Sequence, residues 1–171
     1  MKKNLSRLLQ LVSLTVVLAL IAPEMIHAQA GKANFSGTWV LNTSKSTMPQ
    51  GGGGGGRGGG RMGGSSTFTV TQDANVLTQT RTSQDGTSRA TKYTLDGKET
   101  VNSSGRGERK STAKWSGDGK SLTITTKSSY NGNERTSTEV WSLTDARTLS
   151  IVSTRPGRDG EMKLTMVYDK K

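Results

Sequence analysis

Apolar and polar residues alternate with a period of two through most of the chain after residue 30. In the stretch 35–42, Phe35, Trp39 and Leu41 share one face. Near the other end, the segment 161–169 places a second set on one face: Met162, Leu164, Met166 and Tyr168. This period is typical of strands that bury one side and expose the other.

Short turn signals separate about ten such segments. Asp-Gly occurs at 85–86 and 96–97 and Asn-Gly at 131–132, and these pairs favour tight hairpins. The pattern predicts strands at 35–42, 66–71, 75–82, 88–95, 99–103, 109–116, 121–128, 134–143, 147–155 and 161–169. We therefore predict an all-β fold, a single antiparallel up-and-down meander that closes into a barrel of about 8–10 strands.

The outward faces of these strands argue against a transmembrane barrel. They carry Thr, Ser, Lys and Arg, whereas an outer-membrane barrel needs an apolar band facing the lipid. We also predict no helix after residue 30, so the domain 31–171 is expected to be a single β-barrel.

The first 30 residues resemble a signal peptide. The chain starts with basic residues, continues with a mostly apolar run at 8–22, and reads Ala-Gln-Ala at 28–30, which predicts cleavage after Ala30. An uncleaved anchor is the alternative, but the apolar run is short and Pro23 and Glu24 follow it. The expected location is the periplasm or outside the cell, with no membrane-spanning segment after cleavage.

Residues 50–65 are mostly glycine and predict a flexible loop. Arg57 and Arg61 interrupt this tract, and Arg-Gly segments can bind single-stranded RNA. Export makes a nucleic-acid partner the weaker interpretation. We therefore predict no nucleic-acid binding and a loose connecting loop.

Composition limits the core and suggests a partner class. Only 30% of the residues are hydrophobic and no cysteine is present, so a sheet with one apolar face suits the chain better than packed helices. Cleavage after residue 30 would leave 21 of 24 Lys and Arg and 12 of 13 Asp and Glu, a net charge of +9. Such a charge favours anionic lipid or polysaccharide, or it is simply a solvated surface.

Candidate catalytic chemistry is sparse. The single histidine, His27, lies in the expected signal peptide, and without cysteine the usual nitrogen and sulfur metal ligands are missing. Six of the seven aspartates, all except Asp169, fall in predicted turns, where an aspartate usually accepts hydrogen bonds from its own backbone. We predict no enzyme activity, no metal and no cofactor; a hydrolase would require carboxylates that converge in one cleft.

Aromatic and arginine side chains are the candidates for ligand binding. The aromatic candidates, which could line a cavity or fill the core, are Trp39, Tyr93, Trp115, Trp141 and Tyr168. Three arginines, Arg89, Arg109 and Arg155, share strand faces with apolar residues and could hold an acidic group by paired hydrogen bonds. The alternative is that they extend to water at strand ends. We include Arg155 with the five aromatic residues in the predicted ligand-binding set.

Both ends of the pattern resemble the calycins, the group of lipocalins and fatty-acid-binding proteins. The stretch 35–41 reads Phe-Ser-Gly-Thr-Trp-Val-Leu and resembles the Phe-x-Gly-Thr-Trp-x-Leu opening of fatty-acid-binding proteins, whose Gly-x-Trp is shared with lipocalins. The stretch 164–170, Leu-Thr-Met-Val-Tyr-Asp-Lys, resembles their closing Thr-Arg-x-Tyr-Glu-Lys strand. The resemblance implies that Trp39 plugs one barrel end and that Tyr168 faces a cavity for a small apolar ligand.

The chain departs from these families at several points. Met166 stands where fatty-acid-binding proteins carry a carboxylate-binding arginine, and the glycine tract replaces their helical lid. We therefore expect an exported, non-catalytic binding protein for a small hydrophobic or amphipathic ligand. The alternative is a basic envelope module that docks on anionic lipid or polysaccharide without a small-molecule cavity.

Overall fold

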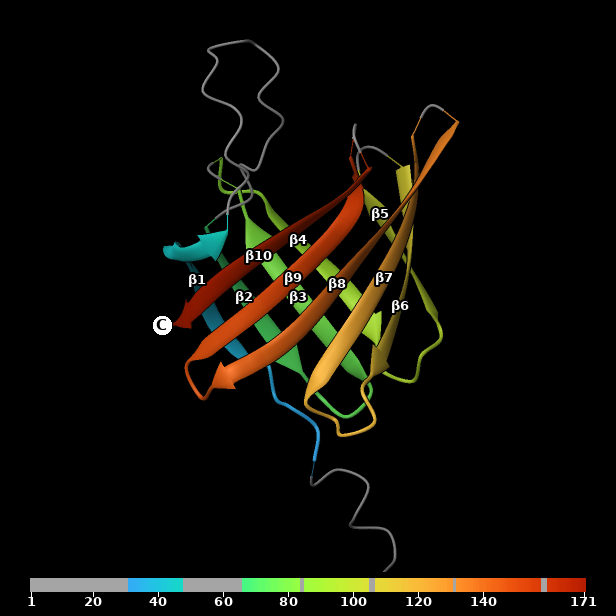
Figure 1. Cartoon of the computed structure of the whole chain (residues 1–171). Helices are drawn as coiled ribbons and strands as arrows, with labels where there is room; N and C mark the ends of the chain where they lie inside the picture. Colours follow the sequence, from blue (N-terminus) through green and yellow to red (C-terminus); the bar gives the residue numbers. More distant parts are fainter. Residues whose placement is uncertain (1–30, 48–65, 84, 105–106, 131, 158–159) are drawn as a thin grey trace, which may run out of the picture. The chain divides into compact units, whose positions relative to one another are not determined.

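The computed structural model describes residues 31–47, 66–83, 85–104, 107–130, 132–157 and 160–171. These residues form ten strands and no helix, as predicted (Figure 1). The expected signal peptide and the whole of the expected glycine loop, residues 50–65, lie outside the described residues. The strands are β1 (Gly37–Thr47), β2 (Thr67–Gln72), β3 (Val76–Thr82), β4 (Ser88–Thr94), β5 (Glu99–Ser104), β6 (Gly107–Trp115), β7 (Ser121–Tyr130), β8 (Asn133–Asp145), β9 (Thr148–Gly157) and β10 (Gly160–Lys170).

One antiparallel sheet contains all ten strands in the order β4-β3-β2-β1-β10-β9-β8-β7-β6-β5. Every neighbour in this order is also a neighbour in sequence except β1 and β10, which pair with Leu41 opposite Tyr168. The first and last strands therefore join, and the meander curls into a nearly closed barrel with β7 to β10 in front and β2 to β4 behind (Figure 1). The predicted all-β up-and-down barrel is confirmed.

The two outermost strands, β4 and β5, meet at a seam that side chains bridge instead of a backbone ladder. The side-chain amide of Asn102 accepts a hydrogen bond from the Lys92 N–H (2.9 Å) and donates one to the Lys92 carbonyl (2.8 Å). The Thr100 hydroxyl accepts a bond from the Thr94 N–H at 3.0 Å. Because these groups satisfy the exposed backbone of β4, the barrel is closed here without a full strand pair.

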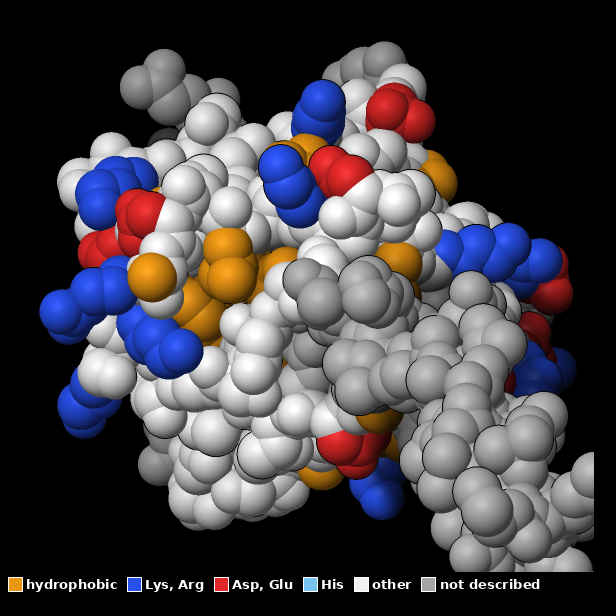
Figure 2. Space-filling view, turned by 90° about the horizontal axis from the view of Figure 1, so that it is seen from below, with side chains coloured by type: hydrophobic (Ala, Val, Ile, Leu, Met, Phe, Trp, Pro, Cys, Tyr) orange, Lys and Arg blue, Asp and Glu red, His pale blue; other side chains and the backbone are white. Residues whose placement is uncertain are grey.

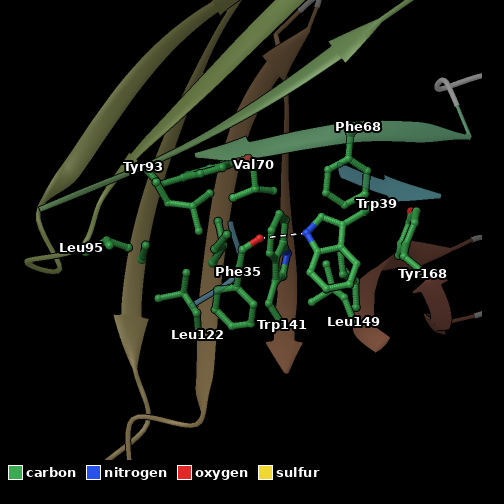
Figure 3. Packing of buried hydrophobic residues seen from close by; sticks show 14 residues of the cluster. Phe35, Trp39, Phe68, Val70, Tyr93, Leu95, Leu122, Trp141, Leu149 and Tyr168 are labelled. Atoms are coloured by element: carbon green, nitrogen blue, oxygen red, sulfur yellow. Dashed lines mark hydrogen bonds between the residues drawn. The ribbon is translucent and has the colours of Figure 1, made fainter. Parts of the chain in front are cut away.

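The apolar core occupies the end of the barrel where β1 begins (Figure 3). Its central contacts are aromatic: the rings of Phe35 and Trp115 stack with centroids 5.8 Å apart, and Phe35 meets Trp141 edge-on at the same distance. The largest fully buried side chains are Trp39, Trp141, Phe35, Phe68, Leu77, Leu122, Ile124, Leu149, Ile151 and Val70. A few large side chains thus provide most of the buried apolar surface.

The segment before β1 plugs this end of the barrel. Phe35 precedes the strand, which begins at Gly37 and runs on to Thr47, so the first strand starts later and ends later than predicted. The Phe35 carbonyl accepts a 2.8 Å hydrogen bond from the Trp39 indole, and the Phe35 N–H donates to the Gln72 side chain at 3.0 Å. These bonds hold the Phe35 ring in its place in the core.

The glycine of the Gly-x-Trp motif has a steric reason. Gly37 has a φ of +142°, and a Cβ at this position would fall 2.5 Å from Cε of Lys170. The ammonium group of Lys170 lies 5.4 Å from the centroid of the Trp39 ring. The positive φ therefore accounts for the glycine, and the missing side chain leaves the Lys170 side chain its place over the tryptophan.

The outside of the barrel is polar and basic. Seen from below, hydrophobic side chains reach the surface in the middle of the view, with Lys and Arg around them (Figure 2). Among the described residues, no helix has both the length and the apolar character needed to cross a membrane.

The seam gives a first prediction. Asn102→Ala should lower the free energy of unfolding by about 1–2 kcal/mol, because two hydrogen bonds are lost and the Lys92 backbone keeps only water as a partner. Urea unfolding followed by tryptophan fluorescence measures this. The control is Ser103→Ala, an exposed neighbour on the same strand, which should change stability by less than about 0.5 kcal/mol. Equal stabilities of the two variants would contradict the structural role of the seam.

Candidate functional site

A cavity of about 420 Å³ opens in the half of the barrel opposite the aromatic core. Inward-facing residues of β3, β4, β6, β7 and β8, together with the first residue after β3, form its wall. The lining residues are Gln79, Arg81, Thr82, Ser83, Arg89, Thr91, Tyr93, Arg109, Ser111, Thr126, Ser128, Ser137 and Glu139. Each of them carries a polar group, and Tyr93 is the lining residue that also belongs to the apolar core.

The change from apolar to polar occurs within single strands. The inward face of β3 runs from Leu77 to Gln79 and then Arg81, each two residues beyond the last. On the opposite wall, β8 runs from Trp141 to Glu139 in the same direction. Because alternate residues of a strand share a face, each strand contributes to both the core and the cavity.

Burial increases toward the floor of the cavity. Arg89 and Arg109 are exposed at its mouth, whereas Gln79, with an exposed fraction of 7%, and Ser111, at 2%, are buried. The hydroxyl of Ser111 shares a hydrogen bond with that of Thr126 at 2.9 Å. The amide nitrogen of Gln79 is buried and has no hydrogen-bond partner among the described residues. A buried donor without a partner is costly, which singles out Gln79.

Positive charge dominates the site. Arg81 and Arg89 stand directly opposite each other on β3 and β4, a placement in which like charges repel. The guanidinium of Arg81 lies 4.5 Å from the centroid of the Phe68 ring, which positions it at the cavity wall. Together with Arg109, these residues give three positive charges against the single carboxylate of Glu139.

Glu139 connects the cavity to the core. One of its carboxylate oxygens accepts a 2.9 Å hydrogen bond from the indole N–H of Trp141, a fully buried core residue. Its negative charge also reaches Tyr93 across the interior, where it acts on the phenol in opposition to Arg81 and Arg109. A change in the surroundings of Glu139 should therefore alter the fluorescence of Trp141.

The two buried tyrosines near the cavity have raised pKa values. Burial raises the pKa of Tyr93 far above 10, and the charge of Glu139 raises it further. Burial also raises the pKa of Tyr168, while the charge of Arg81 and a hydrogen bond with it act in the opposite direction. Both phenols therefore stay protonated near neutral pH.

The predicted ligand-binding residues have different positions. Tyr93 lines the cavity. Trp39 and Trp141 are fully buried in the core, and Trp115 is half-buried against Phe35 with an indole N–H that has no partner among the described residues. The three tryptophans are not among the residues that line the cavity. Their predicted contact with a ligand stays a prediction.

Tyr168 and Arg155 also lie outside the cavity lining. Tyr168 is buried with its ring edge-on to Phe68, and its hydroxyl is 3.5 Å from the sulfur of Met166. Arg155 is exposed and donates to the sulfur of Met162 at 3.6 Å. A direct role for either residue in binding likewise stays a prediction.

Of the three arginines singled out in the sequence, Arg89 and Arg109 line the cavity. Sequence analysis missed Gln79, Arg81 and Glu139. A usable signal was present, because each continues the period of two from a buried apolar residue. Gln79 and Arg81 lie two and four residues after Leu77, and Glu139 lies two residues before Trp141.

Acidic residues do not converge at the cavity. Glu139 is the one carboxylate among its lining residues. The aspartates at turns accept backbone N–H bonds, as Asp73 does from Asn75 and Val76 at 2.7 Å each, and these bonds hold the pKa of Asp73 below its usual value. No group of three or more His, Cys, Asp or Glu residues that could hold a metal occurs among the described residues. The arrangement is suited to holding an anion by hydrogen bonds and charge.

The architecture is shared with known barrels. No protein-family model matches the chain, and no curated protein matches its sequence significantly. A structure of zebrafish ileal bile acid-binding protein in complex with cholic acid aligns with a TM-score of 0.53 and 16% identity, covering 80% of this chain and 98% of that one. A secretory abundant heat-soluble protein from Ramazzottius varieornatus aligns with a TM-score of 0.55 and 11% identity, covering 83% of this chain and all of that one. The likeness confirms a calycin-like fold, as the two ends of the sequence indicated.

Tyr93 gives a second prediction. The folded state keeps the Tyr93 phenol protonated above its ordinary pKa. The contribution of this phenol to the free energy of unfolding is therefore retained up to about pH 10 and is lost as the pH rises further. Tyr93→Phe should make the fall in unfolding free energy between about pH 9 and pH 11 less steep. Urea unfolding at a series of pH values measures the slope. An unchanged slope would show that Tyr93 is not protonated preferentially in the folded protein.

Proposed function

We propose that this chain is an exported, non-catalytic binding protein that holds one small molecule with an acidic group in the polar cavity. The observation that carries the proposal is the buried, unpartnered amide of Gln79 below a wall with three arginines. One buried donor without a partner and an excess of positive charge suit a bound anion. Export rests on the sequence of residues 1–30.

The arrangement suits an anion that first meets the exposed arginines at the mouth of the cavity and then contacts the buried Gln79 at its floor. Arg89 and Arg109 are exposed, and among the described residues neither forms an ion pair with a carboxylate. Their guanidinium groups are free to form paired hydrogen bonds with a planar acid. An incoming anion would also relieve the repulsion between Arg81 and Arg89.

The fold comparison supports the same class of function. The zebrafish protein that shares this architecture binds a bile acid, as its name states. In the present chain the position that resembles the acid-binding arginine of fatty-acid-binding proteins is Met166, and the positive charges stand on β3, β4 and β6. We therefore place the acidic group of the ligand at these three strands.

The proposal gives a third prediction. Arg109→Gln should weaken binding of an acidic ligand by about tenfold or more, since a charge-assisted hydrogen bond is lost. Titration calorimetry with a panel of small acids, including cholate, decanoate and D-glucuronate, measures the affinity. Tryptophan fluorescence should change with binding because Trp141 is hydrogen-bonded to Glu139. Absence of saturable binding by every member of the panel would refute the proposed function.

Arg147→Gln is the matched control. It removes the same charge from an exposed arginine outside the cavity lining, so the affinity should stay within about twofold of the wild type. Equal losses in Arg109→Gln and Arg147→Gln would indicate that total surface charge governs binding. That result would favour the alternative function, docking on an anionic lipid or polysaccharide.

A further inference from the structure

We infer that the ligand is a small, hydroxyl-rich oxyanion, of the size of a sugar that carries one carboxylate or phosphate, and that no acyl chain occupies the cavity. This inference rests on the proposed function and specifies its ligand. It follows from the chemistry of the wall, from the single carboxylate in it, and from the buried amide at its floor.

The wall offers many hydrogen bonds, and more of its surface is polar than apolar. Eight of the thirteen lining residues carry a hydroxyl group, and the other five are one amide, three guanidinium groups and one carboxylate. Hydroxyl groups both donate and accept hydrogen bonds, so they match the hydroxyl groups of a polyol in either direction. An acyl chain would remove water from these groups without replacing their hydrogen bonds, which is unfavourable.

Glu139 requires hydrogen-bond donors on the ligand. One oxygen of its carboxylate accepts from Trp141, and the group lies in the wall of the cavity. A simple anion without donors would be repelled by this charge, although the three arginines attract it. A molecule that has both an acidic group and hydroxyl donors can satisfy the arginines and Glu139 together.

Gln79 extends the recognition into the buried part of the cavity. Its amide nitrogen has no partner among the described residues although its side chain is more than nine-tenths buried. An acceptor on the ligand, such as a hydroxyl oxygen, would satisfy the amide. A site built to bond a hydroxyl group discriminates strongly against a ligand that lacks one.

The size of the cavity agrees with this ligand class. Its volume of about 420 Å³ lies in the lower part of the range of about 300–1,000 Å³ that is common for small-molecule sites. A single sugar ring with its acidic group fits such a space and leaves room for bridging water.

The test compares ligands that differ in one property each. The probes are D-glucuronate and D-glucose 6-phosphate, which join an acid to hydroxyl groups, D-glucose, which lacks the acid, and decanoate and cholate, which join an acid to a large apolar part. Calorimetry on the chain without residues 1–30 and on the full chain should show binding of a sugar acid at least about tenfold tighter than of glucose, decanoate or cholate. The carboxylate and phosphate probes show which acidic group is preferred.

Gln79→Leu supplies the fourth prediction and a second, independent measurement. Leucine has a similar size and removes the unpartnered amide, so the free protein should be as stable as the wild type or more stable in urea. At the same time, the affinity for the better sugar acid should fall by about tenfold. A glutamine that only supports the fold would give the opposite result, lower stability with unchanged affinity.

The outcomes separate this inference from the proposed function. Tighter binding of decanoate or cholate, with the same dependence on Arg109, would keep the proposed function and overturn the hydroxyl-rich ligand. Unchanged affinity for the sugar acid in Gln79→Leu would also overturn it. Failure of all five probes to bind would refute both.

Discussion

The hydrogen bond from the Trp39 indole to the Phe35 carbonyl fixes the element on which the barrel depends. It holds Phe35 under the rings of Trp115 and Trp141, so a residue outside the strands becomes the centre of the core. The chain has only eight aromatic residues, three Trp, three Tyr and two Phe, and no cysteine. With so little apolar material, close aromatic packing at one end replaces a core that fills the whole barrel.

Concentrating the core at one end leaves the other half of the barrel for polar side chains. The same strands that carry Leu77 and Trp141 in the core carry Gln79 and Glu139 in the cavity. An unpartnered amide and the repulsion between two facing arginines are unfavourable in the empty barrel, and the aromatic end supplies the stability that tolerates them. This division separates the part that folds the chain from the part we assign to binding.

The sequence was sufficient for the strands, since the alternation of apolar and polar residues and the Asp-Gly and Asn-Gly turns mark nearly all of them. It also indicated that the first and last strands pair. It could not indicate which inward-facing arginines share a cavity, because that depends on the position of each residue along the barrel. Arg109 and Arg155 look alike in sequence, yet one faces Tyr93 and the other bonds Met162. The neighbours Arg81 and Arg89 meet only through the register of β3 and β4.

The seam between β4 and β5 has a further consequence for the protein at high concentration. Strands at a sheet edge can recruit a second chain and start aggregation. Here the side-chain amide of Asn102 forms hydrogen bonds with the backbone N–H and carbonyl of Lys92, so these two groups in β4 are not available to another molecule. Val101, the large apolar residue with 52% of its surface exposed, lies beside this edge and is paired with Lys110, whose charge opposes self-association. The side chains that complete the barrel therefore also protect its solubility.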